Sequence, residues 1–258
     1  MSSPLLVFGA GQRCGSTLLQ RLICSHPEAF IWGEQGGHLG HILDAVEGLA
    51  GHSARSGRGA REEFAKLGYQ GFLANLMAEP SVMRGAFEDF CTRLFRTPGA
   101  RVWGFKEVRY DLGFATRLQS FLPQLRVIFV TRDPRDVLRS LDEWERFGWW
   151  SRESSVEAID HWQGISASFL ETGSVPVLSM RYEDYIADPE GTAGRVGEFA
   201  GLDPAGFDLS VFDRRVHNLG AEGKRKLRAW GDLPIDLRAL LFEETIRATA
   251  QAYDYSLY

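Results

Sequence analysis

Five short apolar runs, without alternation of apolar and polar positions, are spread along the first 180 residues of the chain. Such runs are typical of strands that are buried on both faces of a parallel sheet. Between them, apolar residues recur every three or four positions, as in amphipathic helices. This pattern predicts an α/β fold in which helices flank a parallel sheet. The expected strands are residues 5–8, 30–32, 102–107, 125–130 and 175–180.

The first apolar run leads into a glycine-rich turn and then a helix. Gly9, Ala10 and Gly11 form the turn, and leucines at helical spacing indicate a helix from about residue 15. The free N–H groups of a first helical turn, together with the helix dipole, attract anions. The segment therefore predicts an anion cradle, with a ligand-free helix start as the alternative.

The residue types in the turn restrict the anion. A triphosphate site of the G-x-x-x-x-G-K-[ST] type needs a lysine directly before the final hydroxyl residue. Here Ser16 precedes Thr17, and the basic residue is Arg13. This arrangement suits one phosphate with a single charge beside it better than a triphosphate with magnesium.

A second anion site is expected where the fourth strand ends. Arg132 follows this strand, Asp133 and Pro134 form an N-cap and first helical position, and Ser140 lies two turns into the helix. A guanidinium at a strand–helix junction binds anions well. Core packing is the favoured interpretation of the aromatic residues that follow, with a substrate wall as the alternative. These residues are Trp144, Phe147, Trp149 and Trp150.

Charged residues follow two further strands. Glu34 comes after the second strand, and it is either a site residue or a solvated loop carboxylate. Lys106 ends the third strand, where it either holds a phosphate or sulfate oxygen or pairs with Glu107. Residues 50–61 are glycine-rich, basic and without apolar periodicity, which predicts a mobile loop.

Composition excludes several classes of protein. The 258 residues are 44% hydrophobic and 24% charged, as in an ordinary globular protein, and the net charge of -5 argues against nucleic acid as a partner. The three cysteines have no disulfide-framework spacing, which indicates reduced thiols. No signal segment or membrane span is recognisable. We therefore expect a soluble, cytoplasmic protein.

Taken together, these motifs resemble those of the sulfotransferases that use 3′-phosphoadenosine 5′-phosphosulfate (PAPS), and their style is closest to the bacterial, carbohydrate and tyrosylprotein members. The segment GAGQRCGSTLL resembles the family's loop for the 5′-phosphosulfate, with cysteine in place of the usual serine. The segment RDPRDVLRS resembles the 3′-phosphate motif. The implied cofactor-binding residues are Arg13, Cys14, Gly15, Ser16, Thr17, Arg132 and Ser140, with Tyr182 beside the adenine.

The resemblance also implies two less specific assignments. Glu34 matches the glutamate that acts as acceptor base in several branches of the family, and no histidine matches the base of the hepatic-type members. Neighbouring strand ends of a parallel sheet open onto one crevice, so Glu34 is expected beside the cradle, with a pKa raised by nearby anions. Lys224 and Arg225 lie in a basic loop that resembles, by position, the loop that covers the cofactor.

The function implied by the resemblance is transfer of a sulfuryl group from PAPS to a hydroxyl or amine acceptor. Arg13 would stabilise the departing phosphate, PAP would be the product, and no metal would be required. Cys14, at a helix N-terminus beside an arginine, is expected to have a lowered pKa. The implied fold is a single domain over residues 1–258, akin to nucleotide kinases, with an insertion at about 38–100 that faces the acceptor.

Two alternatives and several questions stay open. A P-loop phosphotransferase or hydrolase would share the fold, and a non-catalytic module would sense the 3′,5′-bisphosphate nucleotide. The acceptor is a glycan, a lipid or polyketide hydroxyl, a phenol or a peptide tyrosine, and the sequence does not select among them. It also leaves the oligomeric state undefined.

Overall fold

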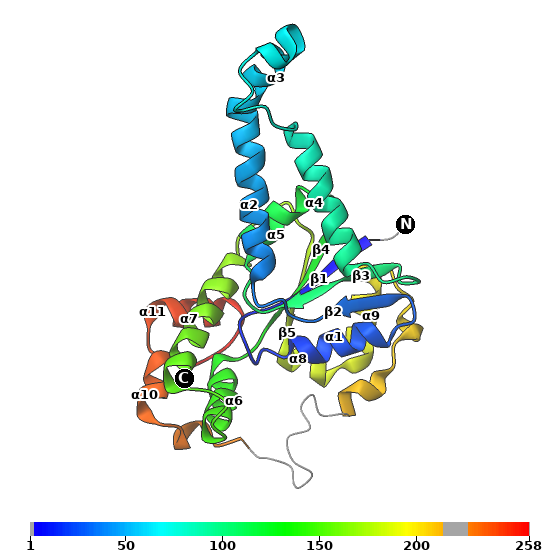
Figure 1. Ribbon diagram of the computed structural model, residues 1–258. Helices are drawn as coiled ribbons and strands as arrows, with labels where there is room; N and C mark the ends of the chain where they lie inside the picture. The colour runs from blue at the N-terminus through cyan, green and yellow to red at the C-terminus, as the bar shows by residue number, and fades with distance from the viewer. Residues whose placement is uncertain (1–2, 214–226, 258) are drawn as a thin grey trace.

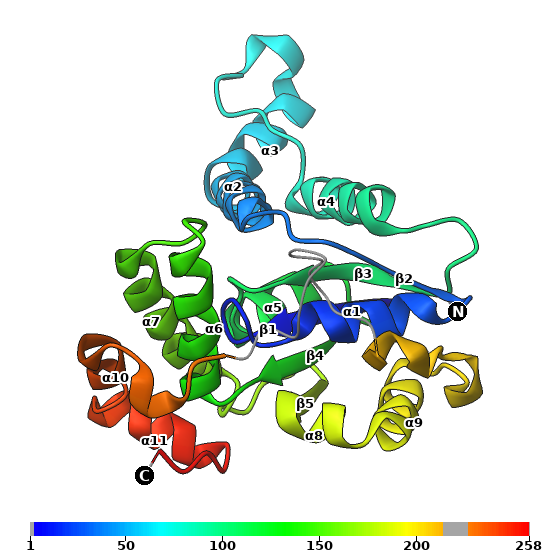
Figure 2. The ribbon, with the colours of Figure 1, turned by 90° about the horizontal axis from the view of Figure 1, so that it is seen from below.

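The computed structural model describes residues 3–213 and 227–257. Within them, a five-stranded sheet has the order β2-β3-β1-β4-β5, and every pairing is parallel. The predicted α/β fold with a parallel sheet flanked by helices is therefore confirmed (Figures 1 and 2). The strands are β1 (Ser3–Gly9), β2 (Ala29–Trp32), β3 (Val102–Glu107), β4 (Arg126–Thr131) and β5 (Val177–Arg181).

Both faces of the central strand β1 are buried, which explains its continuous apolar run. Leu6 and Phe8 pack into the core on one face, and Leu5 and Val7 pack into the core on the other. Each of these four side chains is almost fully buried. A strand with two buried faces has no polar positions to alternate with.

Strands β1 and β2 were expected to be neighbours in the sheet. This expectation is wrong, because β3 lies between them. Val7 of β1 is in register with Lys106 of β3, and Trp32 of β2 is in register with Phe105. The end of β3 therefore separates the cradle loop after β1 from the Glu34 loop after β2. Lys106 and Glu107 consequently lie between the two candidate sites.

The helices begin largely where the capping residues predict. Asp133 accepts a hydrogen bond from the backbone N–H of Arg135 at 2.8 Å, and Asp188 accepts one from Gly191 at 2.9 Å. The α-helices of the main body are α1 (Ser16–Ser25), α5 (Leu112–Gln119), α6 (Pro134–Arg146), α7 (Arg152–Ser168), α8 (Tyr182–Ala187), α9 (Pro189–Ala200), α10 (Ile235–Leu240) and α11 (Glu244–Ala252), the last two of which pack on α7.

Residues 38–96 form a projecting helical arm (Figures 1 and 2). It comprises α2 (His38–His52), the π-helical turn η1 (Ser53–Gly57), α3 (Arg58–Leu67), the 3₁₀ turn η2 (Gly68–Gln70) and α4 (Pro80–Phe95). In the described parts of the chain, no helix is both long and apolar enough to cross a membrane.

The mobile loop predicted at residues 50–61 is wrong, because this segment is helical. Its buried positions, Ala50, Ser53, Gly57 and Ala60, are all small residues, so the sequence shows no stripe of large apolar side chains here. Ser53 donates a hydrogen bond to the carbonyl of Ala78 at 2.6 Å and accepts one from Arg61 at 2.9 Å. These contacts fix the segment to the chain that leads into α4.

Candidate active site

The loop between β1 and α1 has the backbone of an anion cradle. Gly11, Arg13 and Gly15 have φ values of 71°, 68° and 90°. Left-handed residues at alternate positions are typical of turns that direct successive N–H groups to one side. Gly15 is also the N-cap of α1, and it has no side chain with which to cap the first N–H groups. These groups are therefore directed toward a ligand at the helix N-terminus.

Helix α8 holds this cradle from behind. Tyr185 donates a hydrogen bond to the carbonyl of Gly15 at 2.8 Å. A Cβ at position 15 would lie 2.2 Å from the ring of Tyr182 and 2.4 Å from the hydroxyl of Tyr185. Only glycine fits this contact, and its φ of 90° strains any other residue. Tyr182 thus lies against the cradle loop.

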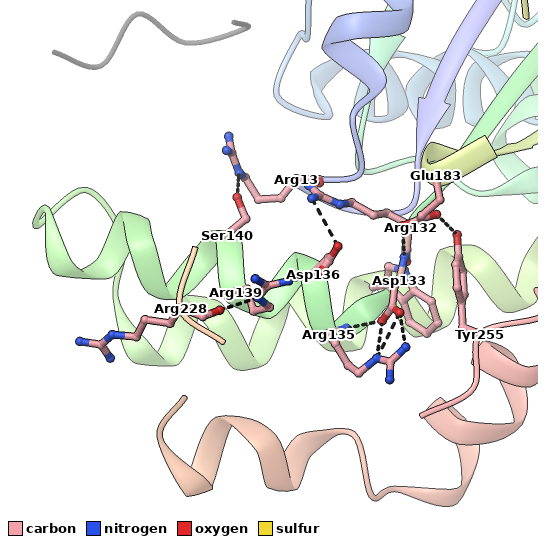
Figure 3. Close-up of polar contacts among 11 residues, drawn as sticks. Arg13, Arg132, Asp133, Arg135, Asp136, Arg139, Ser140, Glu183, Arg228 and Tyr255 are labelled. Carbon is pink, nitrogen blue, oxygen red and sulfur yellow. Dashed lines mark hydrogen bonds and ion pairs between the residues drawn. The ribbon is translucent and has the colours of Figure 1, made fainter. Parts of the chain in front are cut away.

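The two predicted anion motifs meet directly (Figure 3). The Nε of Arg13 donates to the Oγ of Ser140 at 2.8 Å. Arg132 donates in turn to the backbone carbonyl of Arg13 at 3.0 Å, and its guanidinium lies 4.3 Å from the centre of the Tyr182 ring. The ends of β1, β4 and β5 therefore contribute to one site.

Arg13 and Arg132 concentrate positive charge at this site. Burial, and next the charge of Arg132, lowers the pKa of Arg13 to about 10, so it stays protonated at neutral pH. Arg132 is 3.8 Å from a carboxylate oxygen of Asp136, but its Nε is buried and has no hydrogen-bond partner among the described residues. An anion near both guanidinium groups would relieve their repulsion and bind this Nε. The residues present therefore fit a phosphate-bearing ligand.

The expectation of a reactive Cys14 is wrong. Its Sγ donates to the carbonyl of Ala10 at 2.7 Å, and its side chain is fully buried. Burial raises the pKa of the thiol to about 12, more than Arg132 and Arg13 lower it. Residue 14 can contribute its backbone to the cradle, but its side chain faces the core.

The core interpretation of the aromatic segment is also wrong for two of its members. Phe147 is 42% exposed and Trp149 is 50% exposed. Their rings lie 5.7 Å apart, and the ring of Trp149 is 5.9 Å from that of Trp144. Trp144 packs under the guanidinium of Arg13 at 4.4 Å. An exposed aromatic cluster therefore adjoins the cradle arginine.

Glu34 lies between two cations at the end of β2. Its carboxylate pairs with Lys106, and its second oxygen is 2.9 Å from Arg109. Partial burial by itself would raise the pKa of Glu34, but hydrogen bonds and charge from Lys106 and Arg109 outweigh it, so the pKa is lowered. The expected rise is therefore wrong in this structure. Lys106 pairs with Glu34, an arrangement that neither sequence interpretation of Lys106 included.

Glu107 fixes the loop that carries Glu34. This carboxylate is fully buried, and one oxygen accepts hydrogen bonds from the N–H groups of Gln35 and Gly37, both at 3.1 Å. The other oxygen accepts from Arg109 at 2.6 Å. The end of β3 thus determines where Glu34 lies. Across the described ranges, no group of three or more His, Cys, Asp and Glu side chains is arranged to hold a metal ion.

Lys224 and Arg225 lie outside the described residues. The next described part of this basic segment is held on α6 (Figure 3). Arg139 donates to the carbonyl of Arg228 at 2.6 Å, and Arg228 is 3.3 Å from Asp142. Residue 228 is therefore fixed to the helix that bears Ser140.

Arg109 is a residue of the site that the sequence did not single out, and Trp144 was assigned mainly to the core. Arg109 lies two positions after Glu107, just beyond the end of β3, and this proximity was the available signal. Trp144 lies one turn after Ser140 on α6, so both side chains share one helix face. That spacing would have placed Trp144 at the site.

The chain has a parallel sheet, an anion cradle at the end of its central strand and a guanidinium site at the adjacent strand end. This is the arrangement with which α/β proteins commonly bind phosphate-bearing ligands. The sulfotransferase family model matches residues 4–205, and the chain therefore belongs to the sulfotransferase family. The general sulfuryl donor of this family is PAPS.

Solved structures of similar fold are also sulfotransferases. The sulfotransferase domain of the olefin synthase from Synechococcus PCC 7002 has a TM-score of 0.57 at 18% identity, with 100% of this chain and 96% of that chain covered. The sulfotransferase domain from the curacin biosynthetic pathway has a TM-score of 0.58 at 13% identity, with 100% and 99% covered. STF9 from Mycobacterium avium has a TM-score of 0.56 at 15% identity, with 99% and 78% covered. No curated protein sequence matches the chain.

Proposed function

We propose that this protein transfers a sulfuryl group from PAPS to a hydroxyl or amine acceptor. The observation that carries the proposal is the junction of Arg13, Ser140 and Arg132, which joins the cradle to a second anion site. A donor with phosphate groups at both its 5′ and 3′ positions uses both sites. A triphosphate would leave the second site unused, and position 16, where its lysine belongs, is a serine.

The donor would be held by the residues that line the two sites. The cradle backbone from Cys14 to Thr17, with the Ser16 and Thr17 hydroxyls, would bind the 5′-phosphate. Arg132 and Ser140 would bind the 3′-phosphate, and Tyr182 would lie beside the adenine. Lys224 and Arg225 would cover the nucleotide.

Arg13 is proposed to act on the leaving group. When sulfur–oxygen cleavage begins, negative charge grows on the oxygen that bridges sulfur and phosphorus. A sulfuryl group carries less negative charge than a terminal phosphoryl group, so guanidinium and N–H donors are proposed to suffice without magnesium. Arg13 remains protonated at neutral pH and is held at its Nε by Ser140.

Glu34 is proposed to remove the acceptor proton. Its lowered pKa keeps it ionised at neutral pH, which a general base requires. Lys106 is almost fully buried and lies between the Glu34 loop and the cradle strand. We propose that Lys106 turns its ammonium from Glu34 to a sulfonate oxygen during the reaction. Glu34 would then lose one cation, its pKa would rise, and it would become a stronger base.

The acceptor is proposed to lie between Glu34 and the base of the arm. Helix α2 begins four residues after Glu34, and its Gly40 N–H is held by Tyr110 at 2.9 Å. The insertion at about 38–100 would thus face the acceptor with its base. The exposed rings of Phe147 and Trp149 supply an apolar surface beside Arg13.

A donor–acceptor screen tests this proposal. Donor with labelled sulfate is incubated with pooled glycans, phenols, lipid hydroxyls and tyrosine peptides, and products are identified by mass spectrometry. We expect sulfate on one acceptor class, with PAP released in equal amount. Transfer of labelled phosphate from ATP to the same pools, without sulfate transfer, would instead support the phosphotransferase alternative.

A further inference from the structure

The large apolar residues that the arm buries lie on one side of its helices, toward the core. On α2, Leu39 and Leu43 are buried, and on α4 the buried residues are Phe87, Cys91 and Phe95. The α4 positions are four residues apart, so they form one narrow stripe. The rest of the helix surface is left to other contacts.

A second apolar stripe runs along the exposed surface of α4 beside the buried one, and the ring of Phe90 stacks on that of Phe87 at 6.1 Å. Val82, Ala86, Phe90 and Leu94 recur at four-residue spacing, and all four are exposed. Exposed fractions reach 60% at Val82 and 48% at Leu94. A solvated helix face normally carries polar residues at such positions. This stripe is therefore an interaction surface rather than a solvated face.

Apolar side chains are also exposed at the tip of the arm. Tyr69 is 82% exposed and Phe72 is 61% exposed. Of the nineteen large hydrophobic side chains exposed in the described part of the chain, eleven belong to the arm. These are Ile42, Leu49, Phe64, Leu67, Tyr69, Phe72, Leu73, Leu76, Val82, Phe90 and Leu94.

The exposed apolar area is large enough for a stable interface. An aromatic side chain has roughly 150–250 Å² of surface and an aliphatic one somewhat less, so the eleven partly exposed side chains, summed over all sides of the arm, present on the order of 1,000 Å². Monomeric proteins seldom leave more than a few hundred Å² in one apolar patch. A standard interface buries about 800 Å² per partner. The arm as a whole thus carries an exposed apolar area of the size that a specific protein–protein contact buries.

The net charge of the arm favours a second copy of this chain as the binding partner. Residues 38–96 contain seven acidic and seven basic side chains, so the arm is neutral, whereas the whole chain has a net charge of -5. An anionic membrane or a nucleic acid would require a basic surface. Two copies meeting through neutral arms avoid repulsion between their acidic bodies, which the projection of the arm keeps apart (Figure 1). A surface that has no net charge, exposes apolar side chains and carries charges of both signs suits a self-complementary contact.

We propose that two copies of this chain associate as a symmetric dimer through the outer face of the arm. The α4 stripe and the apolar tip residues of one copy would pack against the same surface of the other. This inference is independent of the proposed reaction, because it uses no residue of the candidate active site.

Sedimentation velocity over a range of micromolar concentrations tests the dimer. We expect the native chain to sediment at twice its mass of 28.9 kDa. The double variant Val82→Lys/Phe90→Lys places two charges in the stripe, and its dissociation constant should rise at least about 100-fold, since buried interface residues dominate binding. The matched control is Ile186→Lys/Ile235→Lys, which alters two exposed isoleucines outside the arm. It should remain dimeric, and circular dichroism should show native helix content for all three proteins.

Three outcomes would overturn the proposal. The first is a native chain that is monomeric at every concentration. The second is a dimer that the control variant disrupts and the arm variant does not. The third is a monomer that co-sediments with phosphatidylcholine vesicles and loses this binding in the arm variant, which would assign the surface to lipid.

Discussion

Glu34→Gln is expected to lower sulfuryl transfer by roughly 10²–10⁴-fold, the usual effect of losing a general base. Glutamine keeps the shape of the side chain and one of its two acceptor oxygens, but it cannot take the acceptor proton. The nucleotide sites contain Arg13, Arg132 and Ser140, which this change does not touch. PAP affinity measured by calorimetry should therefore stay the same, while kcat should fall by this factor.

Glu28→Gln is the matched control. Glu28 is a half-exposed glutamate just before β2, and it is paired with Arg101 at 3.1 Å. Its replacement should leave transfer unchanged. Near-normal transfer by Glu34→Gln would remove Glu34 from the mechanism, and His38 would be the next candidate base.

Arg13→Ala is expected to lower kcat by roughly 10²–10³-fold, as does the loss of other groups that stabilise transition-state charge. Charge on the bridging oxygen is larger in the transition state than in the bound donor, so turnover should fall more than PAP affinity. The comparison of kcat with the calorimetric affinity separates these effects. A change confined to the KM of the donor would show that Arg13 only binds the phosphate and does not stabilise the transition state.

The sheet and its caps were predictable because local sequence determines them. Strands buried on both faces need unbroken apolar runs, and each predicted strand overlaps an observed one. Asp133 was recognised as an N-cap by the proline that follows it, and the same pattern at Asp188 and Pro189 also begins a helix. These features depend on residues within a few positions of one another.

Features that depend on distant residues were not predictable. The pairing of Glu34 with Lys106 arises because β3 inserts between β1 and β2, and strand order is not written in any single segment. The inward orientation of Cys14 depends on the left-handed backbone at its neighbours Arg13 and Gly15. The helical arm was also not predicted at residues 50–61, because its buried positions are the small residues Ala50, Ser53, Gly57 and Ala60 rather than large apolar ones.

The site itself was predictable as two separate motifs, but not as one junction. Both motifs were recognised from a strand followed by a helix start with a nearby arginine. Their contact through Arg13 and Ser140 joins positions 127 residues apart. Only the fold shows that the two motifs lie together.

Calorimetric titration with PAP and AMP, in buffer that contains EDTA, tests the central claim most directly because it requires no acceptor. The two nucleotides differ in the 3′-phosphate, which Arg132 and Ser140 are proposed to bind. Charge-assisted hydrogen bonds to this group are worth about 1.5–3 kcal/mol, so PAP should bind roughly 10- to 100-fold more tightly than AMP without magnesium. Equal affinity for the two nucleotides, or binding only when magnesium is added, would contradict the account.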